Sequence, residues 1–190
     1  MKELKEIILK EGKAINENIL KVDGLLNHQV DPILMQKMGS EFAEHFRNAG
    51  ITKVVTIESS GIAPALMTAA ALGVPMIIMK KEPSKILNEG LLQTEVTSYV
   101  KGTSYELTLA DEFIFEDDNV LIIDDFLANG EAATGAIRLI RHAHATVAGL
   151  GVVIEKAFQT GRDKLKEQGI DVYALVRVAK LGTDHIEFTE

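Results

Sequence analysis

Two adjacent carboxylates follow a short apolar run near the middle of the chain. The run is Val120 to Ile123, Asp124 and Asp125 come next, and small residues then lead through Gly130. An apolar run of this length is typical of a buried strand, and the small residues favour a tight turn into a helix. Backbone N–H groups at a helix N-terminus bind phosphate, and carboxylates accept hydrogen bonds from sugar hydroxyls. The segment from Val120 to Ala132 therefore predicts a site for a ribose 5-phosphate.

The rest of the chain alternates between strand and helix patterns. β-Branched and apolar runs predict strands at Thr52–Ile57, Val74–Met79, Val120–Ile123, Thr146–Ile154 and Val172–Val178. Apolar periodicity predicts helices at Met1–Gly12, Asp31–Gly50, Ile62–Leu72, Glu131–Ala143 and Arg162–Gln168, with Asp31 as N-cap before Pro32. This alternation predicts an α/β fold, a mostly parallel central sheet with helices on both faces. Ligands of such sheets bind at the carboxyl ends of the strands.

One segment breaks the alternation. From Leu91 to Leu109, two strand-like stretches flank a turn at Lys101 and Gly102, which predicts an antiparallel excursion that serves as a flexible flap. The length of 190 residues, 46% of them hydrophobic, is typical of a single globular domain over residues 1–190.

The composition argues against several classes of protein. A formal net charge of −8 disfavours a sequence-independent nucleic-acid binder. The absence of cysteine excludes disulfides and thiolate metal sites and suits the cytoplasm, which is the expected location. The apolar stretch from Ile62 to Met79 is long enough to suggest a membrane span, but Pro64, Gly73 and Pro75 divide it into a helix and a strand. We therefore expect no membrane association.

The segment with the two carboxylates closely resembles the signature that binds 5-phosphoribosyl 1-diphosphate (PRPP) in type I phosphoribosyltransferases. The order of the other elements agrees with that family over almost the whole chain. The resemblance implies catalytic roles for Asp124 and Asp125, and PRPP contacts from Ala128, Asn129, Gly130, Glu131 and Ala132. Many family members have hydroxyl residues where this chain has Asn129 and Ala132, so phosphate binding here would depend more on backbone N–H groups.

Two further loops resemble the family's sites for the leaving pyrophosphate. One lies between a strand and a helix, and the other is basic and follows the next strand. Their residues are Ser59, Ser60 and Gly61, and Lys80, Lys81 and Lys85. The resemblance also implies Mg²⁺ carried on the pyrophosphate, with no direct protein ligand, since Mg²⁺ retains several waters.

Lys156 follows another predicted strand and is the candidate for base recognition. An ammonium has three donors and no acceptor, so it can bind the O6 of an oxopurine but cannot satisfy the 6-amino group of adenine. Phe158 nearby can stack on the base or belong to the core. By resemblance, residues 1–30 form a hood in which Leu20 and Asn27 line the base site.

The hood stretch and Lys156 resemble the bacterial branch of the family that uses xanthine, which implies purine salvage that makes xanthosine 5′-monophosphate (XMP). Asn27 can donate to the 2-oxo group of xanthine or accept from the 2-amino group of guanine, so both bases stay open. The alternatives are a hypoxanthine or guanine phosphoribosyltransferase and a regulatory protein that senses PRPP without catalysis. A homodimer is expected by resemblance.

Overall fold

The computed structural model describes residues 1–81, 90–98 and 102–189. Its α-helices are α1 (Lys2–Glu11), α2 (Asp23–Leu26), α3 (Pro32–His45), α4 (Ile62–Leu72), α5 (Glu131–His142) and α6 (Gly161–Glu167), and a 3₁₀ turn spans Asp111–Phe113. Its strands are β1 (Lys13–Ala14), β2 (Leu20–Lys21), β3 (Lys53–Ile57), β4 (Met76–Met79), β5 (Leu91–Ser98), β6 (Thr103–Ala110), β7 (Asn119–Leu127), β8 (Thr146–Lys156), β9 (Val172–Gly182) and β10 (His185–Phe188).

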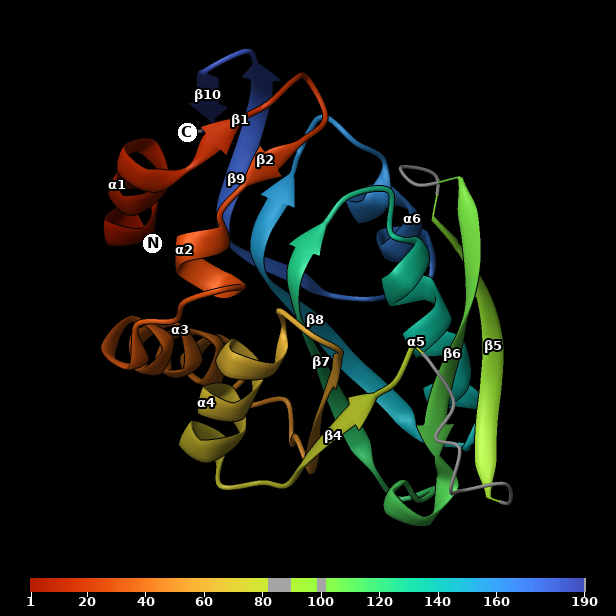
Figure 1. The fold of residues 1–190 in the computed structure, drawn as a ribbon. Coiled ribbons are helices and arrows are strands. Elements are labelled where there is room, and N and C mark those ends of the chain that lie inside the picture. The colour runs from red at the N-terminus through yellow and green to blue at the C-terminus, as the bar shows by residue number, and fades with distance from the viewer. Residues whose placement is uncertain (82–89, 99–101, 190) are drawn as a thin grey trace.

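A six-stranded sheet in the order β10-β9-β8-β7-β3-β4 forms the centre of the molecule (Figure 1). The pairs β3·β4, β3·β7, β7·β8 and β8·β9 are parallel, and only the edge strand β10 runs antiparallel to its neighbour. Helices α1 to α4 cover one face of the sheet, and α5 and α6 cover the other (Figure 1). The predicted α/β fold with a mostly parallel sheet is thus confirmed.

Each face of the sheet has its own apolar core. The first contains Met38 and Phe42 of α3 packed against strand side chains such as Ile123. The second lies under α5 and includes Ile137 and Leu107. Residues buried on both faces explain why the strands read as continuous apolar runs, and they leave room for polar side chains only at the strand ends.

The start of α3 follows the prediction and its end does not. The Asp31 carboxylate accepts hydrogen bonds from the backbone N–H groups of Ile33 at 2.8 Å and Leu34 at 3.1 Å, which caps the helix. The helix was expected to reach Gly50 but ends at His45, and the chain then turns. Phe46 remains buried in this turn, so the apolar pattern extends beyond the helix.

Strand β7 extends four residues beyond the predicted end at Ile123. Its parallel pairing with β8 continues through Asp124 opposite Val152, Phe126 opposite Ile154 and Leu127 opposite Glu155. The two carboxylates are therefore part of the sheet itself. Their backbone is fixed by ladder hydrogen bonds, which gives the side chains a defined position.

Three features of the chain have no counterpart in the sequence pattern. They are the two-residue strands β1 and β2, the single turn α2, and β10 in the acidic tail, which pairs with β9 from His185 to Phe188. The predicted antiparallel excursion is present as the β5–β6 ribbon, which packs against α5. No helix among the described residues is long and apolar enough to span a membrane.

Candidate active site

The predicted site residues gather at one edge of the sheet, where β3, β4, β7 and β8 end. Parallel pairing aligns these ends, with Ile57 of β3 opposite Met79 of β4 and Leu127 of β7 opposite Glu155 of β8. The loops that follow these strands carry the predicted phosphate, pyrophosphate and base residues. The edge therefore brings together three regions that span about a hundred residues of the chain.

Asp124 and Asp125 occupy different environments. Asp124 is only 9% exposed, and its Oδ1 accepts a hydrogen bond from the backbone N–H of Asp125 at 2.9 Å. Burial raises the pKa of the Asp124 carboxyl well above its usual value, and the neighbouring Asp125 raises that pKa further. Asp125 is half-buried, and its Oδ1 accepts from the N–H of Phe126 at 2.9 Å. The pair thus offers one desolvated carboxyl and one more accessible carboxylate.

The predicted phosphate loop is a bend over residues 128–130 that leads directly into α5. Gly130 caps the helix with φ of 86°, a conformation that glycine adopts without strain. Asn129, Glu131 and Ala132 are half-buried around the N-terminus of this twelve-residue helix. Free N–H groups and the helix dipole make such a terminus suitable for an anion.

A second loop supports the phosphate loop from behind. The N–H of Gly161 donates to the carbonyl of Ala128 at 3.0 Å. A Cβ at Gly161 would lie 2.3 Å from that carbonyl oxygen and 3.1 Å from the nitrogen of Gly130. The loop that follows β8 and the phosphate loop are therefore in backbone contact, which only glycine permits at this position.

The loop of Ser59, Ser60 and Gly61 lies between β3 and the N-terminus of α4 and contacts the carboxylates. A Cβ at Gly61 would lie 3.1 Å from Oδ1 of Asp124 and 2.5 Å from the hydroxyl of Thr56. Ser59 is exposed and Ser60 is half-buried. This region thus combines hydroxyls, a helix N-terminus and a nearby carboxyl, a set of groups that can hold a diphosphate and a ribose side by side.

Glu58 joins this loop to the basic residues after β4. Its carboxylate accepts from the backbone N–H of Lys81 at 2.7 Å and from the Lys80 ammonium at 3.3 Å. The Lys81 ammonium lies 5.7 Å from the centre of the Tyr105 ring in β6 and interacts electrostatically with Asp124. Lys81 therefore faces the carboxylate site. Lys85, the third predicted lysine, lies outside the described residues.

The β5–β6 ribbon also reaches the site through Tyr105. Burial raises the pKa of the Tyr105 hydroxyl, and the negative charges of Asp124 and Glu131 raise it further. Tyr105 is therefore close enough to both acids to feel their charge. Lys80 extends the contact, because its backbone pairs with Thr108 of β6 through two hydrogen bonds of 3.0 and 2.8 Å.

Lys156 ends β8 on the other side of the carboxylates. Its ammonium donates to the backbone carbonyl of Asn18 at 2.6 Å and lies 5.5 Å from the centre of the Phe126 ring. Burial lowers the pKa of Lys156, and the negative charge of Asp125 acts in the opposite direction. The link to Asp125 indicates that the predicted base residue and the predicted ribose residues face the same space.

The other predicted base residues are more dispersed. Leu20 in β2 is buried at 7% exposure, and Phe158 follows Lys156 with 39% exposure. Asn27 is exposed at the end of α2, where its side chain is hydrogen bonded to Asp23. No described contact joins Asn27 to Lys156.

Glu155, which precedes Lys156, has a function that the sequence reasoning missed. It is 2% exposed and receives hydrogen bonds from Arg162 at 2.8 and 2.5 Å and from Arg177 at 2.9 and 3.4 Å. Burial alone would raise the pKa of Glu155, but the two guanidinium groups outweigh it and lower the pKa. This triad fixes the end of β8, and an acid followed by two arginines within about twenty residues was its only sequence signal.

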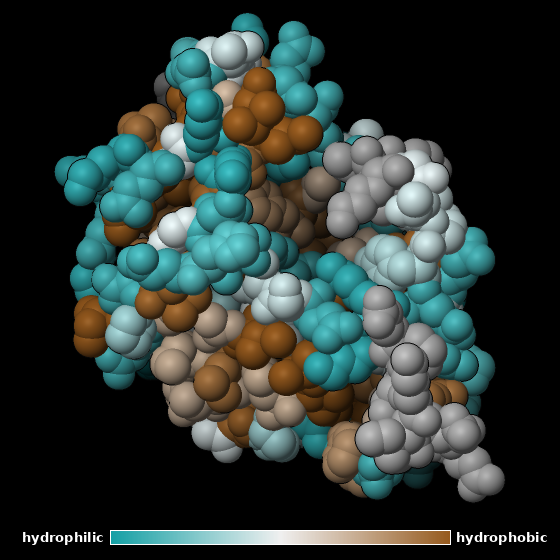
Figure 2. Space-filling view, in the orientation of Figure 1, coloured by the Kyte–Doolittle hydropathy of each residue, from teal (hydrophilic) through white to brown (hydrophobic). Residues whose placement is uncertain are grey.

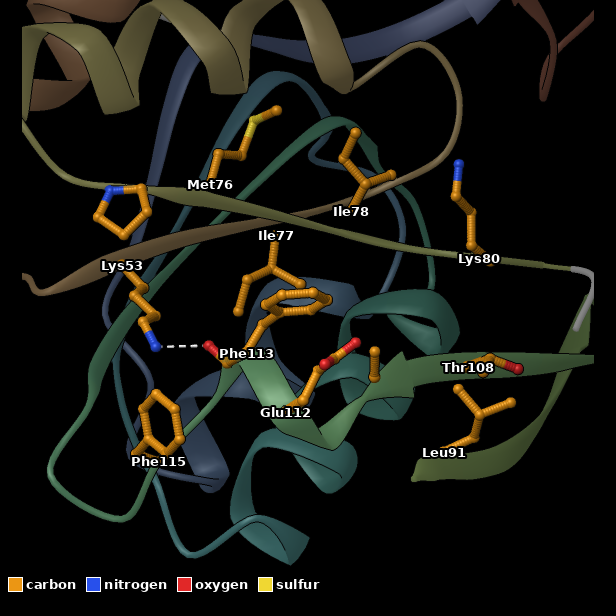
Figure 3. Close-up of a pocket in the computed structure, with 12 residues that line it drawn as sticks. Lys53, Met76, Ile77, Ile78, Lys80, Leu91, Thr108, Glu112, Phe113 and Phe115 are labelled. Carbon is orange, nitrogen blue, oxygen red and sulfur yellow. Dashed lines mark hydrogen bonds between the residues drawn. The ribbon is translucent and has the colours of Figure 1, made fainter. Parts of the chain in front are cut away.

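One cavity of the described chain lies along the edge strand β4, away from the carboxylates. It has a volume of about 630 Å³, and its lining includes Met76 and Ile77 of β4 together with Phe113 and Phe115 (Figure 3). Most of its lining is apolar, and hydrophobic atoms also gather on the nearby surface over α4 and β4 (Figure 2). Its lining includes one predicted site residue, Lys80, and neither Asp124 nor Asp125.

Comparisons with known proteins agree with the geometry of the site. The family model described as a phosphoribosyl transferase domain matches residues 28–179. A xanthine phosphoribosyltransferase of Agathobacter rectalis is 61% identical over 190 residues, which cover all of this chain and 99% of that protein. A xanthine phosphoribosyltransferase of Listeria monocytogenes is 50% identical over the same length, with 99% of that protein covered.

Several solved structures with the same fold are adenine phosphoribosyltransferases. The enzyme of Saccharomyces cerevisiae is 25% identical, with a TM-score of 0.74 over 92% of this chain and 99% of that chain. The enzyme of Rhodothermus marinus is 23% identical, with a TM-score of 0.76 over 93% of this chain and 99% of that chain. The Rhodothermus marinus enzyme, at 23% identity, is evidence of the fold alone.

Replacing Asp124 with Asn is expected to stabilise the fold. The raised pKa means that protonated Asp124 stabilises the native state at low pH and that this contribution is lost as the pH rises through the folded pKa. Asn does not ionise, so the free energy of unfolding of Asp124→Asn should exceed that of the parent by about 1–3 kcal/mol at pH 8, with a smaller difference at pH 5. Urea unfolding at both values of pH measures this. A less stable variant at pH 8 contradicts the assignment of a desolvated carboxyl.

Replacing Glu155 with Gln is expected to destabilise the fold, because two guanidinium groups lose their counter-charge. The loss should be about 3 kcal/mol at pH 7. Since the folded pKa of Glu155 is lowered from its usual 4.5, its contribution is present above that value and is lost as the pH falls through the folded pKa. Urea unfolding with exposed Glu167→Gln as control measures the effect, and equal stability of the two variants would exclude a structural triad.

Proposed function

The chain belongs to the phosphoribosyltransferase family, and we propose that it transfers the 5-phosphoribosyl group of PRPP to N9 of xanthine. The products are XMP and pyrophosphate, and the reaction is a step of purine salvage. The C1′–O bond to pyrophosphate breaks with its electron pair on the leaving oxygen. The bond from N9 to C1′ forms, and N9 loses its proton.

The observation that supports this function best is the environment of Lys156. Its partly desolvated ammonium shares the space of Asp125 with the ribose site and has no acceptor to offer. A 6-oxo group suits this ammonium, whereas a 6-amino group would leave donors facing each other. Full-length relatives that are named xanthine phosphoribosyltransferase at 50–61% identity support xanthine among the oxopurines.

The proposed phosphoribosyl donor, PRPP, suits the groups around the N-terminus of α5 and the two carboxylates. The N-terminus of α5 and the bend at residues 128–130 suit the 5′-phosphate, with Asn129 as a side-chain donor and Ala132 as a backbone donor. Asp124 and Asp125 suit the ribose hydroxyls and would stabilise positive charge on the ribose as the bond to pyrophosphate breaks. Ser59 to Gly61, with the lysines after β4, would stabilise the negative charge on the leaving group.

Mg²⁺ is proposed to arrive with PRPP. Among the described residues, no group of three or more His, Cys, Asp or Glu side chains could hold a metal ion. The oxygen-rich surroundings of Asp124, Asp125 and the two serines are compatible with an ion that keeps its waters and binds mainly to the substrate. Bound in this way, Mg²⁺ would neutralise charge on the diphosphate.

Three further elements belong to the proposal. Residues 1–30 would form the hood over the base, and the β5–β6 ribbon would close over PRPP and exclude water, which limits its hydrolysis. A single domain over residues 1–190, a homodimer and a cytoplasmic location complete it, the last two because they are usual for the family.

Replacing Gly161 with Ala tests the support of the phosphate loop. The new methyl group must displace the carbonyl of Ala128, so the loop and the N-terminus of α5 should shift. We expect the KM for PRPP to rise about tenfold or more, with a smaller change in the KM for the base. Gly182→Ala, whose Cβ meets only ordinary contacts, serves as control. An unchanged KM for PRPP would remove the loop from the proposed donor site.

A base panel tests the acceptor. Turnover of xanthine, guanine, hypoxanthine and adenine with PRPP is followed by spectrophotometry, and xanthine is expected to give the highest kcat/KM and adenine the lowest. Lys156→Gln should lower kcat/KM for xanthine about 10- to 100-fold and reduce the preference over adenine, because an amide can both donate and accept. Exposed Lys166→Gln is the matched control.

Each other outcome of the panel has a clear meaning. Preference for guanine or hypoxanthine would replace xanthine by another oxopurine, and preference for adenine would refute the role of Lys156. Binding of PRPP without turnover of any base would instead identify a PRPP-sensing regulatory protein.

A further inference from the structure

The turn between β1 and β2 is joined to the loop after β8 by two separate contacts at Asn18. The Lys156 ammonium donates to the backbone carbonyl of Asn18 at 2.6 Å. The side chain of Gln159 donates to the side-chain oxygen of Asn18 at 3.4 Å. Figure 1 shows the β1–β2 hairpin beside the end of β8, although the two segments lie about 140 residues apart. Asn18, a residue of the proposed hood, therefore contacts both Lys156 and Gln159.

The turn presents the Asn18 carbonyl in a fixed position. Oδ1 of Asn16 accepts hydrogen bonds from the backbone N–H groups of Asn18 at 2.8 Å and Ile19 at 2.9 Å. The N–H of Ile15 donates to the carbonyl of Ile19 at 2.9 Å, which closes the turn. The carbonyl that meets Lys156 is thus fixed from within the hood, and the Asn18 side chain adds a second contact between this turn and the loop after β8.

Gln159 is fixed to the same loop as Lys156. Its backbone N–H donates to the carbonyl of Lys156 at 2.9 Å, and its Oε1 is buried with no hydrogen-bond partner among the described residues. A buried amide group without a partner lowers stability, so this glutamine is not explained by stability alone. The amide nitrogen of Gln159, Nε2, is the atom that donates to Asn18.

We propose that Asn18 and Gln159 are positioning residues for Lys156 in base recognition, an inference that rests on the proposed function. A lysine side chain is flexible and loses rotamer freedom when it is fixed. The Asn18 carbonyl takes one of the three ammonium donors and thereby orients the other two, one of which meets O6 of the purine. The Asn18–Gln159 contact keeps that carbonyl in register with β8.

The test is a double-mutant cycle that combines Gln159→Ala with Lys156→Ala. In the parent background, Gln159→Ala should raise the KM for xanthine and the Kd for XMP about fivefold, with the KM for PRPP and the thermal midpoint unchanged. In the Lys156→Ala background, the same change should alter the Kd for XMP by less than about twofold. Calorimetry measures this Kd without any need for turnover, and exposed Gln36→Ala on α3 is the matched control.

A conservative replacement separates positioning from packing. Asn18→Ala should reproduce the effect of Gln159→Ala, whereas Asn18→Asp keeps an acceptor for Gln159 and should stay within about twofold of the parent KM for xanthine. An equal effect of Gln159→Ala in both backgrounds overturns the inference, and so does a normal KM in Asn18→Ala. Absence of xanthine turnover by the parent chain would refute the proposed function instead, so the two failures can be told apart.

Discussion

Parallel pairing of the strands is the constraint on which the site depends. Both faces of the sheet are packed against apolar cores, so the interior has no room for charged groups, and polar side chains are confined to the strand ends. Parallel direction then places the ends of β3, β4, β7 and β8 at one edge. A chain whose neighbouring strands alternated in direction would divide these groups between two edges.

Two buried acids at this edge, Glu155 and Asp124, differ in whether their charge is compensated. Glu155 is compensated by Arg162 and Arg177, so its charge is stable and its task is to hold β8. Among the residues that the structure describes, Asp124 has no ion-pair partner, and its pKa is raised because burial and Asp125 both oppose its charge. Active sites commonly keep such unfavourable groups, because they are stabilised only when substrate supplies the missing interactions. The first acid serves the structure and the second is available for chemistry.

The sequence predicted those features that depend on neighbours in the chain. The bounds of α4 agree with the prediction, because Gly73 ends the helix in a left-handed conformation, and the contiguous segment with Asp124 and Gly130 was readable as one motif. Features that depend on distant partners were not predictable. The tail becomes β10 only because β9 is beside it, and the contact of Asn18 with Gln159 joins residues with no local relation. Helix α3 ended early because burial of Phe46 does not require helical structure.

The backbone contact between Gly161 and the phosphate loop links two recognition tasks that the chemistry keeps separate. One loop is the proposed site of the sugar phosphate and the other follows Lys156, the proposed base residue, yet the distance between them leaves no space for a methyl group. Attempts to change the accepted base by exchanging the segment after β8 would therefore also change the support of the donor loop. The two loops should therefore be exchanged as a pair, and substitutions in one should be selected together with substitutions in the other.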